Sequence, residues 1–75
     1  MPMESTRVKS TTLTAVVYDE DHNLLQLCFR DGAIYDYFGV PAHTHRELLA
    51  AKSKGVYFNR EIRGRFRYAA VPGAN

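Results

Sequence analysis

The sequence predicts a small α+β domain in which a three-stranded antiparallel β-meander has two helices packed on one face and a short C-terminal strand. The dipeptide Asp31-Gly32, set between two alternating apolar runs, is a strong hairpin signal. Pro41, which follows the strand-breaking Gly39, is typical of the first turn of a helix, where its missing N–H is not needed. With 75 residues, 45% of them hydrophobic, the chain can fold around one modest core.

Residues 11–71 are expected to form this single domain. The polar segment 1–10 predicts a flexible N-terminal arm, and residues 72–75 predict a short tail. Threonine, valine and tyrosine are frequent in residues 11–19, which predicts the first strand. Strict alternation would turn one set of its side chains inward and the other outward. The inward set is Leu13, Ala15 and Val17, and the outward set is Thr14, Val16 and Tyr18.

The length of the hairpin loop between the second strand (24–30) and the third strand (33–38) decides which side chains face the core. A two-residue loop would pair Leu27 with Asp36 and put that carboxylate on the apolar face. A three-residue loop with Gly32 at positive φ would pair Leu27 with Tyr35. Burial of an unpaired carboxylate is costly, whereas a tyrosine can bury its ring and keep its hydroxyl at the rim. The three-residue loop is favoured, so Tyr35 and Tyr37 are expected to belong mainly to the core.

Two helices are expected after the meander. Residues 41–53 form the first, although Thr44 and Glu47 offer a capping box and a later start. The inward positions of this helix are Leu48, Leu49 and Ala51. A second, shorter helix covers residues 56–63. The alternation of charge and ring over residues 65–68 predicts a last short strand.

No residue set in the chain predicts catalysis, a cofactor or a metal site. His43 and His45 are two residues apart and point to different faces of a helix, so both are expected to be solvated. Cys28 has no base near it in sequence and is expected to act as a small apolar strand residue, in keeping with a reducing cytosol. The chain has no glycine-rich phosphate loop and no apolar run close to the ~20 residues that span a bilayer. We therefore expect a soluble, cytoplasmic, non-enzymatic protein.

Charge is distributed unevenly, although the net charge is only +2. Residues 1–45 contain three Lys/Arg and six Asp/Glu, and residues 46–75 contain seven and two, which gives net charges of −3 and +5. Such asymmetry suggests an anionic partner, although small soluble domains often have lopsided charge without one. The candidate phosphate-binding residues are Lys52, Lys54, Arg63, Arg65 and Arg67.

Ser53, Gly55, Asn59 and Arg63 form the most distinctive polar set. Ser53 and Gly55 lie at the junction of the two expected helices, where backbone N–H groups could hold a phosphate. Asn59 and Arg63 are four residues apart and share a helix face. Each position also has a structural interpretation, in which Ser53 caps a helix, Gly55 turns the chain and Asn59 bonds a loop backbone.

The order of these landmarks along the chain resembles that of a known family. The pattern is Leu25-x-Leu27-x-Phe29, Gly32, Tyr35-x-Tyr37, Val40-Pro41 and then Ala51-x-Ser53-x-Gly55-x-x-Phe58-Asn59-x-x-Ile62-Arg63. It is similar to the KTSC domain, over about residues 8–71. That family occurs as free-standing small bacterial proteins and at the C-terminus of some lysyl-tRNA synthetases. The resemblance implies an α+β domain without an assigned activity, and the synthetase context suggests RNA binding by analogy.

The leading hypothesis is a non-catalytic nucleic-acid-binding module, RNA before DNA. Its Lys and Arg side chains would contact phosphates, and Tyr35 and Tyr37 could stack on bases. The alternative is a protein-interaction module, an adaptor or a homodimer, that uses the open sheet face with Val16, Ile34 and Phe38. Basic residues that frame aromatic rings would favour RNA, and a large contiguous apolar patch would favour a protein partner.

Overall fold

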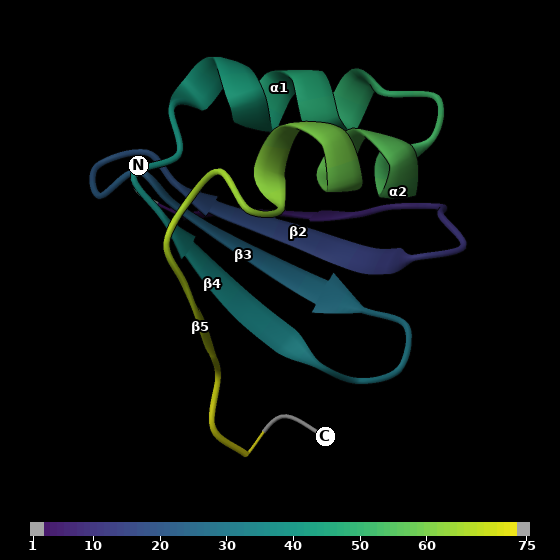
Figure 1. Ribbon diagram of the computed structural model, residues 1–75, viewed down its shortest axis with the longest axis horizontal. Helices are drawn as coiled ribbons and strands as arrows, with labels where there is room; N and C mark the ends of the chain where they lie inside the picture. Colours follow the sequence, from purple (N-terminus) through teal and green to yellow (C-terminus); the bar gives the residue numbers. More distant parts are fainter. Residues whose placement is uncertain (1–2, 74–75) are drawn as a thin grey trace.

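A computed structural model describes residues 3–73 of the chain, and it has one antiparallel sheet with helices on one of its faces (Figure 1). The five strands lie in the order β1-β2-β3-β4-β5. The elements are β1 (Met3–Arg7), β2 (Leu13–Asp19), β3 (Leu24–Phe29), β4 (Ile34–Phe38), α1 (Ala42–Ala50), α2 (Lys54–Tyr57), the π-helical turn η1 (Phe58–Ile62) and β5 (Tyr68–Ala70). The predicted α+β class, with its meander, two helices and late strand, is confirmed.

The sheet has one more strand than the sequence predicts, because residues 3–7 form β1. Ser5 pairs with Val17 and Arg7 with Ala15 along the edge of β2. The prediction of a flexible arm is therefore wrong for residues 3–7. An edge strand needs few apolar side chains, so it leaves a weak signal in the sequence. Residues 1–2 of the predicted arm and residues 74–75 of the predicted tail lie outside the described residues.

The β3–β4 hairpin has the three-residue loop that the sequence favours. The N–H of Gly32 donates to the carbonyl of Phe29 at 3.0 Å, and Gly32 has a φ of 96°. Positive φ is a conformation that glycine adopts without strain. Leu27 pairs with Tyr35 and Leu25 with Tyr37. The predicted register is confirmed, and both tyrosines face the helices.

The β2–β3 pairing slips by one residue between Leu13 and Ala15, which makes a β-bulge with Thr14 as the extra residue. Beyond the bulge, Val16 and Tyr18 turn toward the core, where they are 0% and 3% exposed. The predicted inward and outward sets are therefore exchanged after Leu13. Simple alternation could not predict this, because an inserted residue reverses the faces without changing the apolar composition.

The face of the sheet that lies opposite the helices is not covered by another described element (Figure 1). Ile34 and Phe38 alternate with Tyr35 and Tyr37 along β4 and lie on this open face, where Phe38 is 42% exposed. Val16 was predicted to lie here too, and that prediction is wrong because the bulge moves it into the core.

Helix α1 is shorter than the predicted helix over residues 41–53. It begins directly after Pro41, whose carbonyl accepts a hydrogen bond from the N–H of Thr44 at 3.0 Å. It ends at Ala50, because Ala51 is extended, with a ψ of 138°. Leu48, one of the predicted inward residues, is fully buried.

The second helical segment, residues 54–62, consists of α2 followed directly by η1. The hydroxyl oxygen of Ser53 accepts a hydrogen bond from the N–H of Val56 at 3.2 Å, so Ser53 is the N-cap of this segment. Gly55 lies against the loop before β2, because a Cβ there would approach Thr12 Oγ1 to 2.5 Å. The structural interpretation of Ser53 as a cap is confirmed. Gly55 does not turn the chain as that interpretation expected, because it lies within α2 and has no positive φ.

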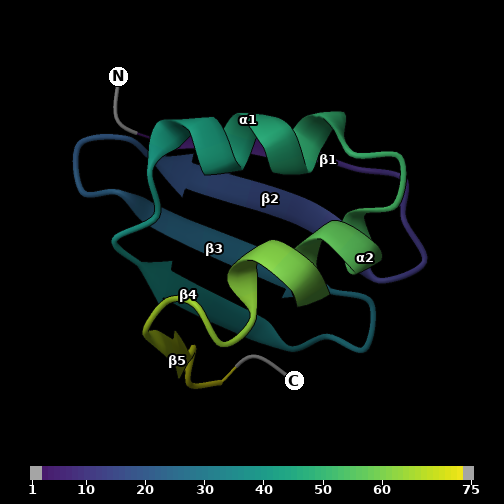
Figure 2. The ribbon, with the colours of Figure 1, turned by 45° about the horizontal axis from the view of Figure 1, so that its top comes forward.

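The core lies in a single layer between the sheet and the helices (Figure 2). Its fully buried large side chains are Leu13, Val16, Leu25, Leu27, Val40, Leu48 and Ile62. Between residues 3 and 73, no helix has the length and apolar character that crossing a membrane requires.

Candidate functional site

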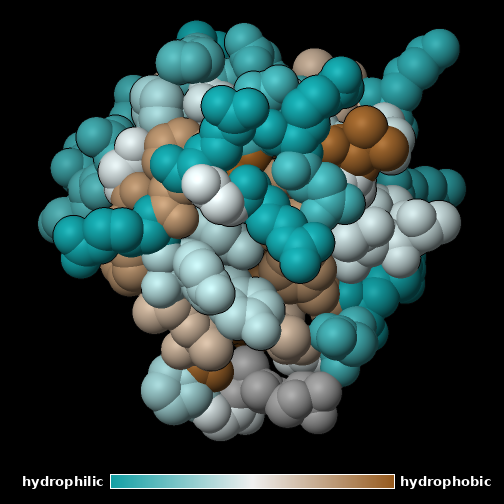
Figure 3. All heavy atoms as spheres, viewed as in Figure 1, coloured by the Kyte–Doolittle hydropathy of each residue, from teal (hydrophilic) through white to brown (hydrophobic). Residues whose placement is uncertain are grey.

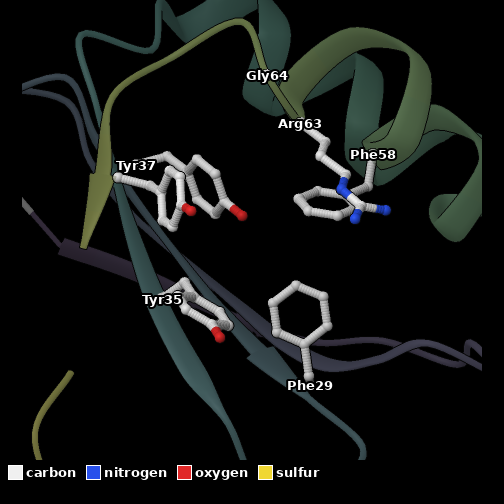
Figure 4. A pocket seen from close by; sticks show the side chains of 7 residues that line it. Phe29, Tyr35, Tyr37, Phe58, Arg63 and Gly64 are labelled. Carbon is white, nitrogen blue, oxygen red and sulfur yellow. The ribbon is translucent and has the colours of Figure 1, made fainter. Parts of the chain in front are cut away.

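An aromatic pocket opens between β3, β4 and η1, at the part of the sheet that α1 does not cover. We call this cavity of about 400 Å³ the aromatic pocket, and its lining consists of Phe29, Tyr35, Tyr37, Phe58, Arg63, Gly64 and Tyr68. Figure 4 shows Tyr35 and Tyr37 on one side of the pocket and Phe58 and Arg63 on the other. Phe29 packs edge to face against Phe58, with ring centroids 5.4 Å apart. The volume is within the range of small-molecule sites in proteins.

Each wall of the aromatic pocket has a local structural cause. The three-residue hairpin loop sets the register that turns Tyr35 and Tyr37 toward the helices. Pairing of β5 with β4 brings Tyr68 opposite Tyr37. On the other side, the π-helical turn closes with a hydrogen bond of 2.8 Å from the N–H of Arg63 to the carbonyl of Phe58. Single π-helical turns are frequent at functional sites, and this one places an aromatic ring and a cation on the same rim.

The rings of the aromatic pocket meet mostly edge to face. Tyr37 and Phe58 have centroids 5.7 Å apart at 77°, and Phe29 contacts Tyr35 at 5.8 Å and 82°. Tyr37 and Tyr68 are the exception, because they lie nearly parallel at 28°. Such contacts hold the rings in place without filling the space between them. The pocket therefore presents π-faces and ring edges to a planar ligand.

Arg63 is the only charged residue in the lining of the aromatic pocket. Its Nη1 donates to Asn59 Oδ1 at 3.2 Å, so the two residues share a helix face as predicted. Asn59 thus orients Arg63, and the prediction that it bonds a loop backbone is wrong. Burial raises the pKa of the Tyr37 hydroxyl, Tyr68 and Tyr35 add to the rise, and Arg63 opposes it. The Tyr37 phenol is therefore neutral near pH 7 and can donate a hydrogen bond.

Arg65 and Arg67 lie beside the aromatic pocket. Together with Gly64, Phe66 and Tyr68 they line a shallow adjoining depression. Arg65 Nε donates to the carbonyl of Arg60 at 3.0 Å, which fixes part of its side chain. The predicted strand over residues 65–68 is displaced toward the C-terminus, so the two arginines precede β5 instead of lying in it. Both are exposed.

Lys52 and Lys54 lie elsewhere. They line a separate cavity with Lys9 and Ser10, at the opposite end of the helical segment 54–62. The predicted phosphate-binding set is therefore divided in two, with three arginines at one end of that segment and two lysines at the other. The two groups were predicted together because they are close in sequence, but a helical segment separates them.

Sequence analysis missed three aromatic rings of the aromatic pocket and one lysine of the cavity that Lys52 and Lys54 line. Phe29 and Phe58 belong to the resemblance pattern but have the spacing of ordinary core residues, and Tyr68 was placed only in the last strand. A pairing of that strand with the Tyr-x-Tyr strand would have been the signal for Tyr68. Lys9 lies in the segment predicted as an arm, so no argument connected it with Lys52.

His45 is not solvated as predicted. It is 4% exposed, and its ring stacks on Tyr18 with centroids 4.5 Å apart. The bulge in β2 explains the error, because it turns Tyr18 inward under α1. Among the described residues, no group of three His, Cys, Asp or Glu side chains could hold a metal ion. Viewed as in Figure 1, the surface shows apolar residues as separate patches among hydrophilic ones (Figure 3).

Comparison with known proteins gives one consistent family. A family model described as the KTSC domain matches residues 9–66. A protein of Tsukamurella paurometabola is 39% identical over 64 residues, which are 85% of this chain and 96% of that protein. A lysine–tRNA ligase of Nostoc sp. is 43% identical over 56 residues, which are 75% of this chain but 10% of the ligase. The crystal structure of a KTSC domain protein from Yersinia pestis matches with a TM-score of 0.88 at 33% identity and covers 92% of this chain and 97% of that one.

Proposed function

The chain belongs to the KTSC domain family, and from this premise we propose that it is a small non-catalytic module that binds single-stranded RNA. One base occupies the aromatic pocket, and Arg63 contacts a phosphate next to it. The arginines beside the pocket, Arg65 and Arg67, contact further phosphates. The observation that carries the proposal is the lining of the aromatic pocket, which combines five aromatic rings with one arginine.

The charge of the pocket favours a nucleotide over a methylated ammonium group, which is another ligand that aromatic pockets bind. Cages for methylated ammonium groups also consist of perpendicular rings, since a cation is attracted to π-faces. Here the one charged residue of the lining is the cation Arg63, and the lining has no carboxylate. A ligand that is planar and also negatively charged fits both features. Base stacking on aromatic rings and phosphate contacts from arginine are the usual means of single-strand recognition.

The position of the pocket favours a single strand over a duplex. Its rings lie between the sheet and η1, so a base enters only if it leaves its stack, which costs a few kcal/mol in a duplex. RNA is preferred over DNA because related segments occur in proteins that are, by name, lysine–tRNA ligases. The ligase activity itself is not part of the proposal, because the shared segment is 10% of the ligase of Nostoc sp..

A titration of a labelled single-stranded RNA at two salt concentrations tests this function. Wild type is expected to bind more weakly at the higher salt, because each phosphate contact releases counterions. Arg63→Gln/Arg67→Gln should lower the slope of log K against log salt by about 1.4, or about 0.7 for each lost contact with a single strand. The control Arg7→Gln/Arg46→Gln removes the same charge outside the pocket and should leave the slope near that of wild type. A duplex of equal charge should compete poorly.

Two outcomes would contradict the proposal: no binding even at the lower salt, or equal binding by wild type and Arg63→Gln/Arg67→Gln. The protein-interaction function would then take its place. One observation favours that alternative. On the open face of the sheet, Phe38 and Met3 lie at the two ends of one row of paired residues. These two large apolar side chains are 42% and 58% exposed, as expected for a surface that contacts another protein.

A further inference from the structure

We propose that a second pocket, which contains all three lysines of the chain, holds phosphates of the same RNA strand whose base occupies the aromatic pocket. This inference rests on the proposed function, because it concerns how one strand runs across the module. We call the second site the lysine pocket. It is lined by Lys9, Ser10, Thr11, Lys52, Ser53 and Lys54, and its volume is about 290 Å³.

The lysine pocket is formed where two loops meet. One loop joins β1 to β2 and the other joins α1 to α2. Gly55 allows this close approach, because a side chain there would collide with Thr12 of the other loop. Lys9, Lys52 and Lys54 are the only lysines in the sequence, so lysines 43 positions apart are gathered at one site. Arg30, which is outside the lining, donates from Nε to the carbonyl of Ser10 at 2.6 Å and so holds this loop against the end of β3.

The polar groups of the lysine pocket are hydrogen-bond donors. Ser10 Oγ accepts hydrogen bonds from two backbone N–H groups at 3.0 and 3.2 Å, and Ser53 Oγ accepts one at 3.2 Å. Neither hydroxyl donates to another described residue, so both O–H groups are available. Lys54 Nζ uses one of its three donors on the carbonyl of Ala51 at 3.0 Å. The lining has no carboxylate. Ammonium and hydroxyl donors without an acceptor partner are the groups that contact phosphate oxygens.

The distance between the two pockets suits one short strand. They lie at opposite ends of the helical segment 54–62, whose nine residues span about 13 Å at 1.5 Å per residue. A stacked single strand advances about 3.4 Å per nucleotide, so about four nucleotides connect the two sites. Between the two pockets, Val56 and Asn59 of this segment are exposed. Glu61 is the only carboxylate of this segment, and its position two residues after Asn59 places it on another face.

A length series of oligoadenylates tests the inference, with adenosine 5′-monophosphate as the shortest probe and hexaadenylate as the longest. Wild type should bind hexaadenylate more tightly than the mononucleotide, by about tenfold or more. Lys9→Gln/Lys52→Gln should bind the mononucleotide as wild type does. The same variant should bind hexaadenylate about tenfold more weakly, with a salt slope lower by about 1.4. Arg63→Gln should weaken binding of both probes, because it contacts the nucleotide in the aromatic pocket.

Two controls separate this effect from loss of charge in general. Lys9→Arg/Lys52→Arg keeps both charges and should bind hexaadenylate within about twofold of wild type. Arg7→Gln/Arg46→Gln loses the same charge outside both pockets and should also bind hexaadenylate within about twofold of wild type. The inference is overturned, with the proposed function intact, if wild type binds both probes equally or if Lys9→Gln/Lys52→Gln binds hexaadenylate as wild type does. If wild type binds neither probe, both proposals are overturned.

Discussion

Two tyrosines flank Leu25 in one row of the sheet, and their surroundings differ. Tyr18 on β2 and Tyr37 on β4 both pair with Leu25, both face the helices, and both are buried, at 3% and 5% exposure. The Tyr18 hydroxyl donates to the carbonyl of Val40 at 2.6 Å, and its ring stacks on His45. At this end of the row, the fold uses both the ring and the hydroxyl.

At the other end of the row, the fold uses only the ring. Tyr37 packs against Phe58 and Tyr68, but its hydroxyl makes no hydrogen bond to another described residue. The same register and the same residue type thus give a closed site beside α1 and an open pocket beside η1. The difference teaches that burial alone does not separate a structural tyrosine from a ligand-binding one. What separates them is whether the hydroxyl group makes a hydrogen bond within the fold.

The largest expected contrast comes from removing a ring at each end. Tyr18→Ala should lower the free energy of unfolding by roughly 3 to 5 kcal/mol, because it leaves a cavity in the core and an unpaired Val40 carbonyl. Tyr68→Ala should cost less than about 1 kcal/mol, because Tyr68 is 61% exposed. Urea unfolding measures both. Equal losses would mean that Tyr68 contributes to stability as a core residue does, and that the pocket beside η1 is closed.

A smaller contrast comes from removing only the hydroxyl groups. Tyr18→Phe should destabilise the fold by about 1 to 3 kcal/mol, since a buried carbonyl loses its donor. Tyr37→Phe should leave stability nearly unchanged. Urea unfolding of this matched pair, with the same chemical change on either side of Leu25, isolates the polar group. If Tyr37→Phe proved as costly as Tyr18→Phe, the Tyr37 hydroxyl would have a structural partner, and the distinction between the two ends would be wrong.

The end of the row at Tyr37, beside the open aromatic pocket, was easier to predict from the sequence than the closed end at Tyr18. There, the hairpin signal and the cost of burying Asp36 fixed the register, and that register turns Tyr35 and Tyr37 toward the helices. At the closed end, one inserted residue at Thr14 reversed the faces of β2. Apolar side chains occur on both faces of that strand, so nothing in the pattern marked the reversal. His45 was misplaced for the same reason, because its burial depends on Tyr18.

The two pockets were beyond the reach of sequence pattern because their residues are distant along the chain. Arg63 was identified from its local spacing with Asn59, and this pair is close in the structure. Lys9 and Lys52 lie at one site only because the loop between β1 and β2 packs beside the loop between α1 and α2. Such an arrangement depends on tertiary packing, and local periodicity carries no information about it.

The smallest expected effect, a dependence of stability on pH, sharpens the description of the closed end. His45 Nε2 is buried without a hydrogen-bond partner among the described residues. Burial lowers the pKa of His45 below its usual value of about 6.5, Glu4 and Glu20 oppose this change, and Arg46 adds to it. The unfolded chain therefore binds a proton at a higher pH than the folded protein. The contribution of His45 to stability is fully present above pH 6.5 and is lost progressively as the pH falls toward the lowered pKa.

The variant His45→Phe tests this contribution, because phenylalanine keeps a ring against Tyr18 and cannot be protonated. Urea unfolding between about pH 7.5 and 5 should show the wild type losing stability by at most about 1.4 kcal/mol per pH unit from this one proton. The variant should have a flatter profile, and at pH 7.5 it should be as stable as wild type or more so, since it removes an unpaired buried polar atom. Identical profiles would show that His45 gains a proton as easily in the folded protein as in the unfolded chain. The stack on Tyr18 would then be open to water, and the contrast between a closed end and an open end would not hold.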